Sequence, residues 1–198
     1  MSDFSTRRAP DRHGPGSPAP ARHHATLRAL HWLVVLAVLV LIPVGFLMIQ
    51  DGLSRPLQDT LFILHKNLGP VVFVLMLIRL VHRLRHPTPP LPPLPRWQHL
   101  AAEANHVALY VLLFVMPISG YLRVRAGGFP IEGLDALGIP TIVPRSDSLE
   151  DLAQAVHFYG AWALLCLIAV HVGAALYHGL VRRDGVVARI WPPMGASR

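Results

Sequence analysis

Four long apolar blocks, separated by polar stretches, define the pattern of this chain. Each block is long enough to cross a bilayer, which takes about 20 residues of helix. Because lipid offers the backbone no hydrogen-bond partners, such blocks must be helical. The pattern therefore predicts an all-α membrane protein, a four-transmembrane-helix bundle, with helices over roughly 28–49, 61–83, 98–122 and 153–181.

Three prolines lie inside these blocks, at Pro43, Pro70 and Pro117. In a membrane, neighbouring helices re-satisfy the carbonyls that a proline frees, so we expect bends and no breaks. The first block is too long for the apolar region of a secretory signal, and no small-x-small cleavage site follows it in GFLMIQDG. It is therefore expected to remain as a helix.

The polar stretches divide the chain into a domain and its flanks. Residues 1–26 are rich in Pro, Ser, Arg and His without apolar periodicity, which predicts a disordered cytoplasmic arm. Residues 27–192 form the predicted four-helix domain, and residues 193–198 a cytoplasmic tail. Inside the domain, HPTPPLPPLPR at 86–96 predicts a stiff polyproline connection. Residues 124–152 form a long external loop with turn signals and no assigned element.

The charged residues are few and one-sided. Only 15% of the residues are charged, against about a quarter in soluble domains, and the net charge is +7. An excess of basic residues marks cytoplasmic segments, so both termini and the proline-rich connection are predicted to be cytoplasmic. The basic balance reflects this topology and argues against nucleic-acid binding. The basic residues on the predicted cytoplasmic side are Arg7, Arg8, Arg12, Arg22, Arg28, Arg79, Arg83, Arg85, Arg96, Arg182, Arg183, Arg189 and Arg198.

Histidines inside the apolar blocks are the candidate functional residues, because an ionisable side chain in a membrane is costly. His157 and His171 lie fourteen residues apart in the last block, which is about 21 Å along a helix. Fourteen steps of about 100° fall about 40° short of four turns, so both rings project from nearly one face. Two histidines stacked across the bilayer suit a pair of haem irons, each of which needs a second axial ligand.

The topology selects those second ligands. The first helix runs outward and the second runs back, which places His31 at the level of His171 and His65 at the level of His157. The cytoplasmic pair His31/His171 and the external pair His65/His157 predict two noncovalent haems b, one above the other, inside the bundle.

Small and basic residues at matching positions give weaker support. Gly45, Gly69 and Gly160 lie where small residues would let a macrocycle approach the helices, although glycine also lines ordinary helix contacts in membranes. Arg79 lies fourteen residues after His65 and is a candidate partner for a haem propionate. Snorkelling at a cytoplasmic helix end explains Arg79 equally well.

Two further histidines compete for the inner site. His178 follows His171 by seven residues on the same face, about 10 Å nearer the cytoplasm, and His106 opens the third block at the level of His31. Either fits an axial ligand, a proton relay or a quinone-site donor, and we favour His171 as the inner ligand. His82, at the cytoplasmic end of the second helix, is interpreted as an interfacial residue.

The residues that other kinds of cofactor or metal site require are absent from the sequence. Cys166 is the only cysteine, which excludes an internal disulfide, a CxxCH haem attachment, an iron–sulfur cluster and a cysteine zinc site. A metal permease with coincidental histidines would need carboxylates or more histidines at one depth, whereas Glu103 and Asp184 lie at predicted cytoplasmic ends. No phosphate-binding loop or HExxH motif occurs.

Four segments together resemble the bacterial cytochrome b-561 family: LHW at 30–32, LHKNLG at 64–69, RHPTPPLP at 85–92 and the H-x13-H helix. The resemblance covers roughly Thr26 to Pro192. It implies a multi-pass protein of the bacterial inner membrane, with two haems b and electron exchange with ubiquinone in a respiratory chain. It also implies the ligand set His31, His65, His157 and His171.

The resemblance leaves two functions open. Some members resemble superoxide oxidases, oxidoreductases that take an electron from external superoxide and reduce quinone. Related proteins are membrane-anchor cytochromes that relay electrons from a partner dehydrogenase or hydrogenase.

The charges of the external connections bear on this choice. A positive outer face would steer an anion. Acidic residues outnumber basic ones in the two external connections, although Lys66 beside His65 offers a local positive entrance. The expected partners are lipid, quinone and an external electron donor, which is superoxide or a redox protein, and assembly as a homodimer stays open.

Overall fold

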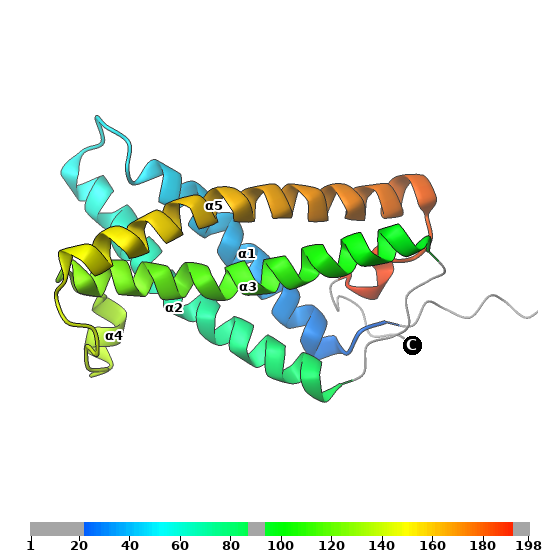
Figure 1. Cartoon of the computed structure of the whole chain (residues 1–198), viewed down its shortest axis with the longest axis horizontal. Helices are drawn as coiled ribbons and strands as arrows, with labels where there is room; N and C mark the ends of the chain where they lie inside the picture. The colour runs from blue at the N-terminus through cyan, green and yellow to red at the C-terminus, as the bar shows by residue number, and fades with distance from the viewer. Residues whose placement is uncertain (1–21, 87–93, 192–198) are drawn as a thin grey trace, which may run out of the picture.

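The computed structural model describes residues 22–86 and 94–191. Residues 1–21 of the predicted arm, most of the polyproline connection and the predicted tail lie outside the described residues. Four long helices account for the apolar blocks: α1 (Ala25–Leu47), α2 (Arg55–Arg85), α3 (Arg96–Ala126) and α5 (Asp147–Leu176) (Figure 1). The π-helix η1 (Tyr177–Arg182) continues α5. All four are long and apolar enough to cross a membrane, which confirms the predicted fold class.

The helices are longer than the apolar blocks alone predict. Helix α2 starts six residues early because Pro56 sits in its first turn, where a missing N–H costs nothing. Helix α3 continues past the apolar block and ends at Ala126, with Gly127 as its C-cap residue. Each of the three internal prolines lies within a continuous helix, as expected.

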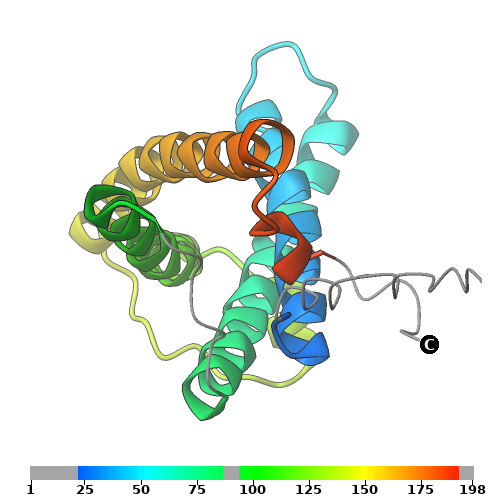
Figure 2. The ribbon, with the colours of Figure 1, turned by 90° about the vertical axis from the view of Figure 1, so that its right-hand side faces the viewer.

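The helices are arranged as two pairs. Helix α3 packs along α5 and α1 along α2, and the pairs are joined mainly where α2 meets α3. Figure 2 looks along the bundle and shows α3 with α5 on one side and α1 with α2 on the other. Among the described residues, α1 and α5 share few close backbone contacts.

A small apolar core joins the first pair to α3. Val34 and Ala37 of α1 are buried against Val72 and Met76 of α2, with Phe114 of α3 packed on this cluster. In the most apolar part of each long helix, only 6 to 17% of the residues are buried inside the molecule. The remaining apolar surface is therefore suited to lipid.

The two ends of the described chain meet at one end of the bundle, here called the terminal end. The His23 N–H donates to the Arg189 carbonyl at 3.1 Å. The Trp32 Nε1–H donates to the Ile190 carbonyl at 2.9 Å, next to the 3₁₀ turn η2 (Val187–Arg189). These bonds fold the C-terminal segment back onto α1.

A short helix that the sequence did not predict, α4 (Glu132–Ala136), lies in the loop between α3 and α5. It marks the opposite end of the bundle, here called the α4 end. Lys66 Nζ lies 2.7 Å from Glu132 Oε1, and Asn67 Nδ2 donates to Glu132 Oε2 at 2.8 Å. The Gly133 N–H donates to Asn67 Oδ1 at 2.6 Å. These contacts dock α4 onto α2.

An ion pair holds the other side of α4. Arg125, near the end of α3, donates both terminal nitrogens to the Asp135 carboxylate. The bonds from Arg125 lower the pKa of Asp135. Burial would raise the pKa of Glu132, but the bonds from Lys66 and Asn67 outweigh it and lower that pKa. Both carboxylates are therefore ionised at neutral pH, and α4 is clamped between α2 and α3.

Candidate functional site

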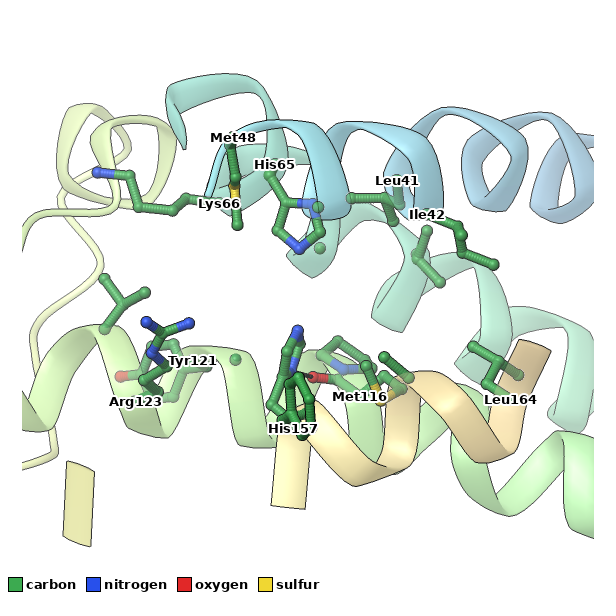
Figure 3. Close-up of a pocket in the computed structure, with 18 of the residues that line it drawn as sticks. Leu41, Ile42, Met48, His65, Lys66, Met116, Tyr121, Arg123, His157 and Leu164 are labelled. Carbon is green, nitrogen blue, oxygen red and sulfur yellow. Dashed lines mark hydrogen bonds between the residues drawn. The ribbon is translucent and has the colours of Figure 1, made fainter. Parts of the chain in front are cut away.

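Two of the candidate histidines face each other near the α4 end. The rings of His65 (α2) and His157 (α5) have centroids 6.1 Å apart and planes inclined by 77°. Figure 3 shows the two rings pointing toward each other from opposite walls of one cavity. The structure therefore brings together two residues that lie far apart in the sequence, from the two different helix pairs.

The spacing of these rings would allow both imidazoles to bind one metal ion. Imidazole nitrogens bind transition metals at about 2.0–2.1 Å, and a ring centre lies about 1.1 Å behind its nitrogen. Two imidazoles on opposite sides of one metal ion thus have centres about 6.3 Å apart, close to the 6.1 Å observed.

The orientation of His157 is set by α3. Its Nδ1 lies 3.0 Å from the Met116 carbonyl and 3.1 Å from Ser119 Oγ, and Ser119 is buried. A carbonyl only accepts, so Nδ1 carries the proton and donates it, which leaves Nε2 as the free lone pair. Metal-binding histidines are commonly oriented by such a bond from the other ring nitrogen.

Glycines make room for both rings. A Cβ on Gly45 would lie 2.9 Å from Cε1 of His65, and a Cβ on Gly120 would lie 3.2 Å from Cε1 of His157. Gly120 was missed in the sequence analysis, because only the fold brings it next to His157. Both glycines are therefore needed for the rings to stand where they do.

The other two candidate glycines behave differently from each other. Gly69 has no atom within 4 Å of where its Cβ would be and borders the cavity, as expected of a residue that leaves room for a ligand. Gly160 meets Met116 instead: its Cβ would lie 2.9 Å from Sδ. Gly160 thus permits the close packing of α5 on α3 that brings His157 to the Met116 carbonyl.

The cavity between the rings has a volume of about 240 Å³ and draws its walls from all four long helices. Aliphatic and aromatic side chains form most of the wall, including Leu41, Ile42, Phe46, Leu164 and Trp162. Lys66 and Arg123 lie together toward one end of it in Figure 3. The space is apolar along its length and positive at this mouth, beside α4.

A second facing pair lies nearer the terminal end. The rings of His31 (α1) and His171 (α5) have centroids 6.3 Å apart, inclined by 65°. This separation also matches two ligands of one metal ion. His106 of α3 adds a third ring, edge-on to His171 at 5.3 Å.

His178 belongs to a different contact. It lies in η1, and its Nδ1 is 2.6 Å from Asp184 Oδ2. Burial would raise the pKa of Asp184, but the bonds from His178 and the Val186 N–H outweigh it and lower that pKa. His178 is thus engaged by a carboxylate, while His171 faces His31.

Two arginines accompany the second pair. Arg79 donates to the Leu27 carbonyl at 2.9 Å and lies close enough to His31 and His171 for its charge to act on both rings. Arg28, one turn before His31, is only 8% exposed, and its Nε and Nη1 have no hydrogen-bond partner. A buried guanidinium without a partner is costly, so this position is suited to an anion.

Arg28 was missed as a site residue, because it reads as one of many basic residues near the N-terminal arm. Its burial is a property of the folded chain, which no local sequence pattern reveals.

Comparison with known proteins gives independent evidence for the family to which the chain belongs. A family model for prokaryotic cytochrome b561 matches residues 22–193. Cytochrome b561 homolog 2 of Escherichia coli (strain K12) is 33% identical over 178 residues, covering 86% of this chain and 92% of the homolog. Cytochrome b561 homolog 1 of the same strain is 30% identical over 168 residues, covering 82% and 93%. The probable superoxide oxidase CybB of Yersinia pestis is 30% identical over 168 residues, covering 82% and 92%.

The matched region contains all four long helices and both facing histidine pairs. Noncovalent b-type haem is the redox group of this family, and imidazole pairs are suitable iron ligands for it. The chain is therefore a multi-pass membrane protein of the prokaryotic cytochrome b561 family, which carries electrons with haem b.

Proposed function

We propose that the chain carries electrons across the bacterial inner membrane by means of two noncovalent haems b, and exchanges them with ubiquinone. The observation that carries this proposal is the pair of ring separations, 6.1 and 6.3 Å, at two levels of one bundle. Bound haem would supply the one-electron chemistry, and the protein supplies ligands, spacing and a low dielectric.

His65 and His157 are the proposed ligands at the α4 end. The Met116 carbonyl keeps the proton of His157 on Nδ1 and so presents Nε2 as the ligand atom. Gly45 leaves the space in which the His65 ring stands, and Gly69 borders the cavity. These residues together orient the two imidazoles before any cofactor arrives.

His31 and His171 are the proposed ligands at the terminal end. Arg79 and Arg28 are the proposed partners of the propionates there. The charge of Arg79 acts on both rings. Arg28 lies one turn before His31, and its Nε and Nη1 are buried without a hydrogen-bond partner. A propionate would relieve the desolvation penalty of Arg28, which no protein group within the described residues offsets by a hydrogen bond.

The quinone end is proposed to be the terminal end. Reduction of a quinone takes up protons as well as electrons, so its site needs groups that pass protons. His106, beside His171, and the His178–Asp184 pair are such groups at this end. By the positive-inside rule we assign this end, and both termini, to the cytoplasm.

Superoxide is the proposed external donor. Lys66 and Arg123 at the mouth of the cavity make a local positive entrance to the His65/His157 level. Glu132 partly offsets Lys66, whereas no hydrogen bond or ion pair is described for Arg123. A relative named as a probable superoxide oxidase supports this choice over a protein donor.

The alternative is a membrane-anchor cytochrome b that relays electrons from a partner dehydrogenase or hydrogenase. Exposed apolar side chains in the loop at the α4 end favour it, notably Phe129, Leu137 and Ile142. Such residues in a polar loop are typical of contact surfaces. Co-purification of a stoichiometric redox partner in mild detergent would select this function.

The decisive test is a dithionite-reduced minus oxidised spectrum of the purified protein, with a pyridine haemochrome count per chain. The proposal expects a b-type α band and about two haems per chain. Stopped-flow reduction by superoxide should then be rapid in the wild type and slower in Arg123→Gln at low salt, and the difference should shrink as salt is raised, because salt screens the steering charge. Absence of haem in protein made with ample haem would overturn the whole proposal. Failure of superoxide to reduce the wild type would overturn only the choice of donor, and unchanged kinetics in Arg123→Gln would overturn only the steering role of Arg123.

A further inference from the structure

Three histidines outside both facing pairs form a separate cluster at the terminal end. His24 caps the start of α1, and His82 and His86 lie at the end of α2. One ring nitrogen from each lies within 4.8 Å of the others. The proposed electron path uses none of these residues, so the cluster needs an account of its own.

The helix places two of the three ligands. His82 and His86 are four residues apart, so they stand one above the other on the same face. Their rings stack at 4.0 Å between centroids, with planes inclined by only 13°. The ring of His24 approaches from α1 at 5.0 Å from His82 and 5.1 Å from His86.

The hydrogen bonds leave ligand atoms available. His86 Nδ1 lies 3.0 Å from the His82 carbonyl, so it donates its proton there and leaves Nε2 with a free lone pair. His82 Nδ1 is buried and has no hydrogen-bond partner. His24 Nδ1 accepts only a long 3.4 Å bond from the Thr26 N–H, which is weak and readily given up.

We propose that His24, His82 and His86 bind one Zn²⁺ ion, with water as the fourth ligand. Three imidazoles without a thiolate or carboxylate are a donor set for zinc and not for Mg²⁺ or Ca²⁺, which take oxygen ligands. In a tetrahedral site with bonds of about 2.0–2.1 Å, ligand atoms stand about 3.4 Å apart. To reach that distance from within 4.8 Å, the exposed His24 and His86 would rotate, and the rotation of His86 would end its parallel stacking on His82.

The ion would tie the first helix to the end of the second. Its ligands come from both members of the α1/α2 pair, beside the start of the proline-rich connection. A ligand that binds only the folded chain stabilises it by mass action, so zinc should raise the thermal stability of the protein. No group of the proposed haem sites takes part.

The test uses haem-loaded protein carrying a Strep tag in place of a histidine tag. Equilibrium dialysis against Zn²⁺, read by plasma mass spectrometry, should give one zinc per chain. His82→Ala and His86→Ala should each weaken binding by about a hundredfold or more, since loss even of supporting residues costs 10- to 100-fold. His99→Ala, another histidine of the terminal end but outside the cluster, should bind as the wild type does.

Two readouts keep the outcome clear. An unchanged reduced-minus-oxidised spectrum in each variant shows that the fold and the haem are intact. If His82→Ala loses that spectrum, its zinc binding is not interpreted. His86→Gln then serves as the test variant, because His86 is exposed and its replacement should leave the fold intact. Zinc binding that is absent in the wild type, or that persists unchanged in His86→Ala and His86→Gln, would overturn the site without touching the haem proposal.

Discussion

The ring that each histidine faces distinguishes the histidines of the last long helical segment. His157 faces His65 and His171 faces His31, with ring centroids 6.1 and 6.3 Å apart. His178 instead has its Nδ1 2.6 Å from the Asp184 carboxylate. The opposing side chain, and not the spacing of the histidines, therefore favours His171 over His178 as the proposed ligand.

His157→Ala and His171→Ala should each remove a different haem, leaving about one haem per chain. The remaining haem should differ in α-band position and midpoint potential between the two variants, because the proposed sites have different surroundings. Redox titration with a haemochrome count measures both. Cys166→Ala, on the same helix between them, is the matched control and should keep the wild-type count.

Gly45→Ala should lower haem occupancy at the His65/His157 level. The added Cβ would stand 2.9 Å from Cε1 of His65, so the ring must move, at a cost of about 1–3 kcal/mol for overpacking. Gly173→Ala is the control, since a Cβ there meets nothing within 4 Å. Equal haem content in the two variants would contradict the placement of His65.

Arg28→Leu should have opposite effects with and without haem. Removing an unpaired buried charge should raise the thermal stability of haem-free protein. In the haem-loaded protein, one midpoint potential should fall, because less positive charge then stabilises the reduced form. Arg28→Lys should restore most of the potential. A potential that does not move in Arg28→Leu would remove Arg28 from the site.

Helix α4 is stabilised by contacts with residues that are distant in sequence. Its five residues are too few to be stable alone. It is held by Lys66 and Asn67 of α2 and by Arg125 of α3, so a reading of the loop by itself did not find it. The four long helices, by contrast, were predictable because each has a continuous apolar block of its own.

Asp135→Asn should loosen α4, because the buried Arg125 would lose its charged partner. The rate of proteolysis in the loop between α3 and α5 should rise by at least about two- to fivefold, the effect of losing a weak ion pair. The pKa of Asp135 is lowered in the folded chain, so its contribution is complete at neutral pH. It is lost only as the pH falls below the ordinary carboxyl value of about 3.9. Cleavage should therefore rise at low pH in the wild type and much less in Asp135→Asn.

At the scale of the molecule, the sequence was sufficient for the number of spans, and it predicted that His31 would face His171 and that His65 would face His157. It was not sufficient for Gly120 or Arg28, since the first depends on how α3 meets α5 and the second became a candidate only through its burial in the folded chain. Helical periodicity reports the direction of a side chain. It does not report which other segment of the protein packs against that side chain.

The orientation of the whole bundle is tested with reporter fusions. Green fluorescent protein fused after Arg198 should fluoresce, because we expect both termini in the cytoplasm. Alkaline phosphatase inserted in the loop near Leu137 should be active, because that loop is expected outside. The reverse pattern would invert the proposed direction from donor to quinone.

Helix α5 contributes one histidine to each facing pair, and it is the last long helix to be made. A nascent chain with three helices in the membrane therefore holds neither of the proposed haem sites, however much haem is present. Both sites become complete within one insertion event, separated by the synthesis of fourteen residues. Cofactor capture would then be a late step of biogenesis, and a chain truncated before Val156 would reach the membrane without haem at either level.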